Sequence, residues 1–170
     1  TGINNTLVGG LAGDALTTGG KNVAIGYAAL STEDTRNYAV AIGYQALTSQ
    51  NADADTYNVA IGYKAGEAVS TGVQNTIVGG AAGDALTTGS YNAAFGYGAL
   101  STEDTYGKNT AIGFHALATL NAAADGYNTA VGFQAGQTMS TGVQNTIIGA
   151  ETGDALTTGA YNIAIGFRAL

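Results

Sequence analysis

A nine-residue pattern that recurs ten times dominates this sequence. Its clearest copy runs from Asn22 to Leu30, and the ten copies begin at positions 5, 22, 39, 58, 75, 92, 109, 128, 145 and 162. Each copy, together with the chain up to the next copy, is called a coil. Successive starts have a constant spacing of seventeen positions, lengthened to nineteen only from 39 to 58 and from 109 to 128. A short, fixed period of this kind predicts a repeat architecture in which each coil contacts mainly its neighbours.

A longer period groups the coils into blocks of four. The segment Gly13 to Gly19 returns as Gly83 to Gly89 and as Gly153 to Gly159, a constant shift of seventy positions. We therefore interpret residues 1–170 as a single array of about two and a half copies of a 70-residue block. Both ends fall inside a repeat, whereas solenoids need polar caps. We expect the array to be an uncapped segment of a longer protein.

Within each coil, alternating residue types predict a short strand. Counting the usual Asn as position 1, position 2 is Thr, Val, Ile or Ala, position 4 is always large and apolar, and position 6 is usually Tyr or Phe. Helices are disfavoured because the chain contains 27 Gly. The pattern predicts an all-β fold, a parallel β-solenoid or β-roll of about ten coils of roughly 17–19 residues, with two short strands per coil.

Two positions of the repeat are predicted to be structural. The Asn amide at position 1 can bond to the next coil and to turn backbone, forming a ladder that Ala39 interrupts once. The Gly at position 5 would supply a positive φ or a close approach that no Cβ allows. The Asn residues are Asn5, Asn22, Asn58, Asn75, Asn92, Asn109, Asn128, Asn145 and Asn162, and the Gly residues are Gly9, Gly26, Gly43, Gly62, Gly79, Gly96, Gly113, Gly132, Gly149 and Gly166.

Both faces of the predicted strand are nearly free of charge. A strand with one face in water should alternate apolar and polar residues, so we expect both faces to be covered. A roll with coils this short hides only one of them. Self-association around an axis parallel to the solenoid would cover the other, and the sequence leaves open which face points inward.

The repeat Asn-x-Ala-Ile-Gly-[Tyr/Phe]-x-Ala-[Leu/Gly] resembles the YadA-like head repeats of trimeric autotransporter adhesins. It is also similar to the Asn-Thr-Ala-Ile-Gly-Tyr-x-Ala-Leu arrays of phage tail fibres, and the likeness covers essentially the whole chain. The resemblance implies a left-handed parallel β-roll assembled as a homotrimeric fibre. The length of the coils, and an aromatic residue after the Gly in seven of them, favour the fibre-type arrays.

Composition excludes several functions. The net charge of −7 argues against nucleic-acid binding, which needs a basic surface. No apolar run approaches the roughly 18 residues of a membrane span. The absence of Cys removes disulfides and thiolate chemistry. We therefore expect no nucleic-acid partner and no membrane insertion of this segment.

The sequence offers little for catalysis, and we predict no catalytic, cofactor-binding or metal-binding residue and no cofactor. His115, the single histidine, stands at a position that accepts Lys, Arg and Gln in other coils, as well as Ala and Gly, so we interpret it as solvent-facing. The carboxylates Glu33, Asp34, Asp53, Asp55, Glu103 and Asp104 fall in predicted turns and could in principle bind Ca²⁺. Their spacing matches no calcium motif, so we interpret them as a solvated acidic rim.

Three other features are weaker. The Thr pairs at 17–18, 87–88 and 157–158 suggest ice binding, but they recur only every fourth coil. The Tyr/Phe column could stack on sugars, although its place on the Ile face favours core or interface packing. The Gly-Gly pairs at 9–10 and 79–80 lack the strand–helix context of a phosphate loop.

The sequence thus favours a non-enzymatic structural protein, a segment of a trimeric phage tail fibre acting as a rigid spacer on the virion. It could also present a surface to a cell-surface glycan or protein receptor. The alternatives are a trimeric adhesin head on a bacterial surface and an ice-binding or other surface-binding β-solenoid. A polysaccharide-cleaving tailspike would need one pair of carboxylates in a groove, and acids that repeat with the block do not single out such a pair.

Overall fold

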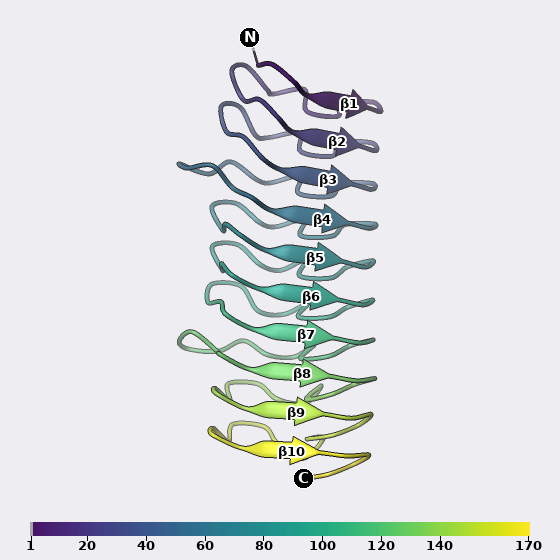
Figure 1. Cartoon of the computed structure of the whole chain (residues 1–170), viewed down its shortest axis with the longest axis vertical. Coiled ribbons are helices and arrows are strands. Elements are labelled where there is room, and N and C mark those ends of the chain that lie inside the picture. Colours follow the sequence, from purple (N-terminus) through teal and green to yellow (C-terminus); the bar gives the residue numbers. More distant parts are fainter. Residues whose placement is uncertain (1) are drawn as a thin grey trace.

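The computed structural model describes residues 2–170, which form ten three-residue strands in one parallel sheet (Figure 1). Strands pair in sequence order and at equal phase, so that Ala24 lies opposite Ala41 and Ala41 opposite Ala60. This confirms the predicted all-β parallel solenoid. The strands are β1 (Thr6–Val8), β2 (Val23–Ile25), β3 (Val40–Ile42), β4 (Val59–Ile61), β5 (Thr76–Val78), β6 (Ala93–Phe95), β7 (Thr110–Ile112), β8 (Thr129–Val131), β9 (Thr146–Ile148) and β10 (Ile163–Ile165).

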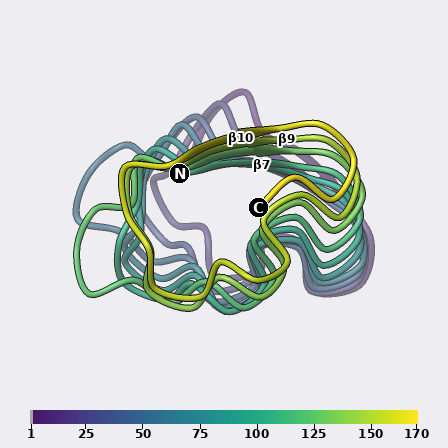
Figure 2. The same cartoon turned by 90° about the horizontal axis from the view of Figure 1, so that it is seen from below.

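Successive coils superimpose when the molecule is viewed along its long axis (Figure 2). The two longer coils, which follow β3 and β7, project beyond the others at one side (Figures 1 and 2). Their extra residues lie in exposed bends at 53–54 and 123–124. The additional residues are thus accommodated in a turn without disturbing the register of the sheet.

The prediction of two strands per coil is wrong, because the second apolar element is a left-handed turn. Positions 7 and 9 have positive φ, for example 54° at Ala28 and 52° at Leu30, whereas a parallel strand needs φ near about −120°. Backbone hydrogen bonds still join this turn to neighbouring coils, from Ala28 N to Gly10 O (2.9 Å) and from Leu30 N to Ala46 O (3.0 Å). The segment is therefore stacked like a sheet but does not have strand conformation.

The structure places the Asn/Ala face inside and the Val/Ile face outside. From β2 to β10, the position-3 side chain of every strand is buried. Side-chain volumes in this thin core compensate one another. The fully buried Ile77 belongs to a coil with Gly83 at position 9, where a Cβ would come within 3.3 Å of Ile77 Cδ1. Four coils with Ala at position 3 carry instead a buried Leu at position 9, as Leu30 does.

The Asn residues form the predicted ladder. The Oδ1 of each Asn accepts a hydrogen bond from the backbone N–H at position 1 of the next coil, at 2.8–3.2 Å in eight consecutive-coil pairs. Six Asn side chains also donate from Nδ2 to a carbonyl 14 residues later, as from Asn58 to Gly72 O (2.7 Å). These bonds explain how a polar side chain can be buried in nearly every coil.

Ala39 interrupts the ladder, and Gln50 bridges the interruption. Gln50 is fully buried, and its Oε1 accepts a hydrogen bond from Asn58 Nδ2 (2.8 Å). One block later, the equivalent positions hold Asn109 and Leu120, and Asn109 Oδ1 accepts from Asn128 Nδ2 (3.1 Å). The acceptor for the next Asn side chain is therefore Gln50 in the coil of Ala39 and Asn109 in the equivalent coil one block later. The prediction of an interrupted ladder did not include this compensation.

Both predicted reasons for Gly at position 5, a positive φ and a close approach that no Cβ allows, are confirmed. All ten have φ between 122° and 143°. At Gly96 an added Cβ would lie 2.6 Å from the carbonyl carbon of Gly113 in the next coil. The column therefore allows the backbones of adjacent coils to approach where the chain leaves the strand.

Gly96→Val is expected to destabilise the protein by well over about 1 kcal/mol, because the backbone must change conformation and adjacent coils must separate. Chemical denaturation measures the loss. Gly80→Val is the matched control, since Gly80 has no positive φ and a Cβ there would meet only the edge of the Tyr97 ring, at 3.3 Å. Equal stability of the two variants would show that the Gly column is incidental.

Gln50→Leu is expected to cost about 1–3 kcal/mol, because it removes a buried acceptor from Asn58 and a buried donor from Glu33. Adding Ala39→Asn should recover part of that loss, since the double variant reproduces the Asn109 and Leu120 pair. A double-mutant cycle measures the coupling. Purely additive effects would contradict the proposed compensation.

Candidate functional site on the outer face of the sheet

The outer face of the sheet is a continuous, largely apolar surface. It is made by the position-2 and position-4 side chains of all ten strands, each half-buried or exposed. Ile61 and Ile112 in the middle of the array are 37% and 40% exposed. None of these positions carries a charged residue. An exposed apolar face of this length marks an interaction surface.

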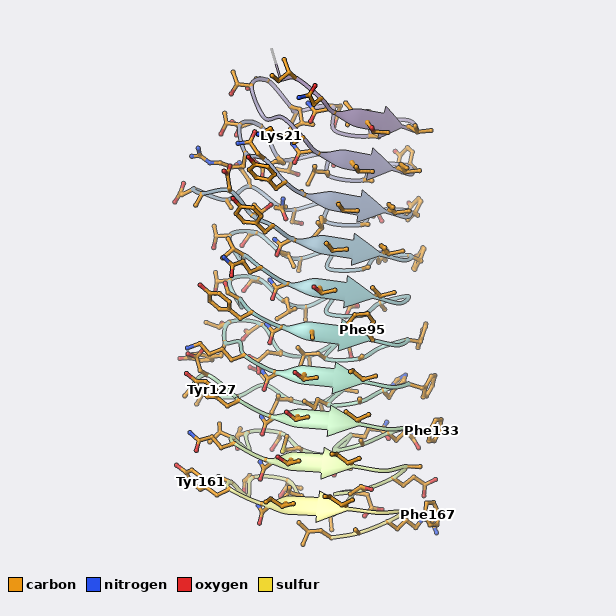
Figure 3. All side chains as sticks on the ribbon, viewed as in Figure 1. Lys21, Phe95, Tyr127, Phe133, Tyr161 and Phe167 are labelled. Carbon is orange, nitrogen blue, oxygen red and sulfur yellow. The ribbon has the colours of Figure 1, made fainter. Side chains whose placement is uncertain are left out.

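Two further columns border this face. The trailing column is position 6, just after the Gly, and the leading column is the residue immediately before position 1. Figure 3 shows Tyr127 and Tyr161 of the leading column at one lateral margin, Phe133 and Phe167 of the trailing column at the other, and Phe95 between them. The seven aromatic residues of the trailing column are exposed, so the column extends the outward-facing surface of positions 2 and 4 beyond the end of each strand.

The aromatic rings of the trailing column stack along the solenoid axis. The ring centroids of Tyr27 and Tyr44 are 5.4 Å apart and those of Tyr44 and Tyr63 5.5 Å apart. Tyr97, Phe114 and Phe133 continue with separations of 5.8 and 5.4 Å. The rings face one another within 17° of parallel. The column is therefore a ladder that the equal-phase register of the coils produces.

Both columns lack an aromatic residue in the coils of β1, β5 and β9. There the trailing residue is Gly10, Gly80 or Ala150, and the leading residue is Asn4, Gln74 or Gln144. The rings on either side of one such gap, Tyr63 and Tyr97, are each 58% exposed, against 44% for Tyr44. The four-coil block thus divides the trailing column into sections of three rings.

Lysines replace the aromatic residue of the leading column in two other coils. Lys21 Nζ donates to the Tyr38 hydroxyl (2.8 Å) and lies 4.7 Å from the centroid of that ring. Lys108 Nζ donates to Tyr127 (2.9 Å) and to Asp125 Oδ2 (2.6 Å). The hydrogen bond to Tyr38 raises the pKa of Lys21, and the bond from Lys108 lowers the pKa of Asp125. These cations therefore lie at the margin and leave the centre of the face uncharged.

The interpretation of all the turn acids as a solvated rim is wrong for Glu33 and Glu103, which are fully buried. Glu103 accepts hydrogen bonds from the N–H groups of Tyr106 (3.2 Å) and Ala122 (3.1 Å). Glu33 accepts from Arg36 N (3.1 Å) and Gln50 Nε2 (3.3 Å). Both belong to the coil before one of the two longer coils, and other coils place Leu, Val, Met or, at Gln50, Gln at the same position. They therefore anchor turns from inside.

The other acids are not buried. Asp53 is exposed, Asp34 and Asp104 are half-buried, and Asp55 accepts a hydrogen bond from Asn37 Nδ2 (2.6 Å). Among residues 2–170, no three His, Asp or Glu side chains gather as a metal ligand set would.

A small open hollow of about 200 Å³ lies between neighbouring coils near the C-terminal end, lined by Gln134, Gln137, Thr138, Glu151 and Asp154. Small-molecule sites are usually larger, and Glu151 is already paired with Arg168. The hollow is therefore a poor candidate for a ligand site.

His115 packs on the aromatic ladder. Its ring centroid lies 4.2 Å from that of Phe114 and 5.7 Å from that of Tyr97. The side chain is half-buried, so it is less open to solvent than its position in the repeat suggested. Its contacts are those of a packed ring at the margin of the face.

Three of the six hydroxyls in the Thr pairs donate to the next coil. Thr17 Oγ1 donates to Asp34 O (3.0 Å), Thr87 Oγ1 to Asp104 O (2.7 Å) and Thr88 Oγ1 to Thr105 O (3.3 Å). Hydroxyls engaged in this way hold the turns together, and they do not form a free flat array.

Comparisons with protein-family models, with curated proteins and with solved structures give no match. Within residues 2–170, no helix is long and apolar enough to cross a membrane. A functional assignment therefore depends on the chain's own surface.

The sequence pattern identified the Tyr/Phe column of the outer face. It did not predict that Glu33 and Glu103 are buried, nor that both marginal columns lack an aromatic residue in the same three coils. The buried position is recognisable in retrospect. It lies eleven positions after position 1, and it is Leu, Val or Met in six coils and Glu or Gln in three. A column that is mostly apolar indicates an inward position even where one coil carries a carboxylate.

Glu103 is expected to make stability depend on pH. Burial raises its pKa above the ordinary value of 4.5, against the opposing effect of the two N–H donors. A raised folded-state pKa stabilises the protein below the unfolded pKa, and this contribution is lost as pH rises through the folded pKa. Relative to Glu103→Gln, the wild type should gain stability as pH falls from neutral towards 4.5. Melting temperatures of both chains across this window test it, and a pH-independent difference would contradict it.

Proposed function

We propose that this chain is a non-enzymatic segment of a homotrimeric fibre, most simply a phage tail fibre, in which it acts as a rigid spacer on the virion. The observation that carries the proposal is the continuous apolar outer face of β1–β10. Exposed Val, Ile and Phe side chains in successive coils are costly in water, since each Å² of apolar surface removed from water contributes about 25 cal/mol.

A second and third copy of the same chain fit this face best. All coils are in register, so a parallel copy offers a matching apolar row at every level. In a closed assembly with three-fold symmetry, the apolar face of every chain is covered by the other two chains. Positions 2 and 4 would lie nearest the axis, and the two aromatic columns would lie at the seams between subunits. A left-handed winding of each roll belongs to the same proposal and is supported by the repeat's resemblance to adhesin heads and fibre arrays.

The remaining surface suits a spacer. The polar turns lie away from the apolar sheet, with Asp53 exposed, and hydroxyls such as that of Thr87 tie each turn to the next coil. Such a rod keeps the parts of the fibre on either side of it at a fixed distance, and its polar turns keep the fibre soluble. The turns, or the seams between subunits, could also contact a receptor on a cell. A bacterial adhesin head would use the same architecture, and the repeat supports it equally, but the coil lengths favour the phage type.

The solution mass tests the proposal directly. Light scattering on a sizing column should give three times the chain mass of 16.8 kDa. Ile112→Lys, in the middle of the outer face, should convert the trimer to monomer, because it places three charges near the axis. Ala123→Lys, in an exposed bend, is the matched control and should leave the mass unchanged. A stable wild-type monomer would contradict the proposal and would favour a surface-binding solenoid.

A further inference from the structure

The leading and trailing columns lie at opposite margins of the outer face (Figure 3), yet their residue types change together along the chain. In seven coils the trailing residue is aromatic, and the leading residue of the same coil is Tyr or Lys. In the other three coils the trailing residue is Gly or Ala and the leading residue is Asn or Gln, as with Gly80 and Gln74. Among residues 2–170, no ring-to-ring contact joins the two columns. Contact within one chain therefore does not account for the correlation.

Both columns are open to contact from outside the chain. All seven aromatic residues of the trailing column are exposed, and so are four of the five tyrosines of the leading column. In the coil of β4, the leading Tyr57 is 52% exposed and the trailing Tyr63 is 58% exposed. Exposed aromatic residues in continuous rows are typical of an interaction surface.

We propose that the leading column of each chain packs against the trailing column of the next copy at the same level of the solenoid. Gln74 then meets Gly80 of the next copy, and Tyr57 meets Tyr63. This inference rests on the proposed homotrimer and adds the residues and the register of its seams. In a closed ring of parallel copies, each contact is heterologous, so the leading margin of one chain meets the trailing margin of its neighbour.

The width of the sheet suits three chains joined in this way. Gln74 and Gly80 are six residues apart, which is at most about 20 Å of extended chain. A triangle with sides of this length places each sheet about 6 Å from the axis, close to half of the roughly 10 Å that separates sheets packed face to face. The side chains of positions 2 and 4 then fill the centre. Four chains would lie about 10 Å from the axis and would leave an open channel.

The side chains suit contacts at equal level. Where the trailing residue is Gly80, no side chain covers the backbone, and the amide of Gln74 can donate to and accept from its peptide groups. Lys108 lies at the level of Phe114, and an ammonium group against an aromatic ring is favourable. In the remaining aromatic coils, ring meets ring.

A shift of the neighbour by one coil would lose the match at the Gly level. Gly80 would then face Tyr57 or Tyr91, and Gln74 would face a ring in place of bare backbone. An amide that is buried against a ring leaves hydrogen-bonding groups without partners, which is costly. The amide and the Gly of the same coil therefore favour the unshifted register.

Paired cysteines test the contact and its register, since the chain contains no native Cys. In the variant Gln74→Cys with Gly80→Cys, a short reagent that bridges two thiols should link each chain to both neighbours and give a covalent trimer on a denaturing gel. The shifted pairs, Gly80→Cys with Tyr57→Cys or with Tyr91→Cys, should be linked roughly tenfold more slowly, because one coil moves the thiols apart by about 4.8 Å. Gly80→Cys with Gln144→Cys, four coils apart, is the matched control and should stay unlinked.

The solution mass of each variant, measured before linking, separates the seams from the trimer. Faster linking of a shifted pair would overturn the register. A trimeric mass with no linking of any of these pairs would overturn the contact between the columns and leave the trimer standing. A monomeric wild type would overturn the proposed function together with its seams. Should Gly80→Cys itself lose the trimer, Ala150→Cys with Gln144→Cys replaces the first pair, because Ala150 already carries a Cβ.

Discussion

The hydrogen bond from one Asn backbone N–H to the Asn side chain of the previous coil is the interaction on which the rest of this structure depends. It fixes neighbouring coils at equal phase, and in six coils the amide nitrogen of the same Asn also donates to the adjoining turn, as from Asn58 to Gly72 O. Because the amide is satisfied inside the roll, a polar residue can occupy the core at nearly every level. The narrow interior then holds mainly Ala with one or two larger side chains such as Leu30 or Ile77, and the aromatic residues and the Val and Ile side chains of positions 2 and 4 lie outside it.

Periodicity alone was enough to predict the solenoid, because a constant interval between identical motifs allows parallel pairing at equal phase. It could not predict which face is buried. Neither face carries charge, and Asn22 or Asn58 taken singly would be assigned to solvent. The burial of Asn becomes favourable only when the next coil supplies the donor. The same reason explains the error over Glu103, whose buried carboxylate is satisfied in part by the backbone of a turn 19 residues away.

The second strand was predicted wrongly for a local reason. Residues such as Ala28 and Leu30 are apolar and spaced like a strand, but they have left-handed φ, which costs a non-Gly residue roughly 1–2 kcal/mol. The intrinsic conformational propensities of Ala and Leu do not predict this conformation. It recurs at positions 7 and 9 of every coil, directly after the Gly column, so it is a property of the repeat along the whole fold. The sequence likewise shows Gly80 and Ala150 in place of an aromatic residue. That these residues interrupt a stacked column of rings follows only from the structure, in which the rings of neighbouring coils lie one above another.

The central claim is that the Val/Ile face points outward and meets its own copies. The chain contains no native Cys, so single cysteines can be spin-labelled without background. Pulsed electron paramagnetic resonance on Ile61→Cys should give short distances between chains, because position 4 lies near the proposed axis. Labels at Ala123→Cys, in an exposed bend, should give much longer ones. Short distances at 123 and long ones at 61 would place the turns at the interface and contradict the account.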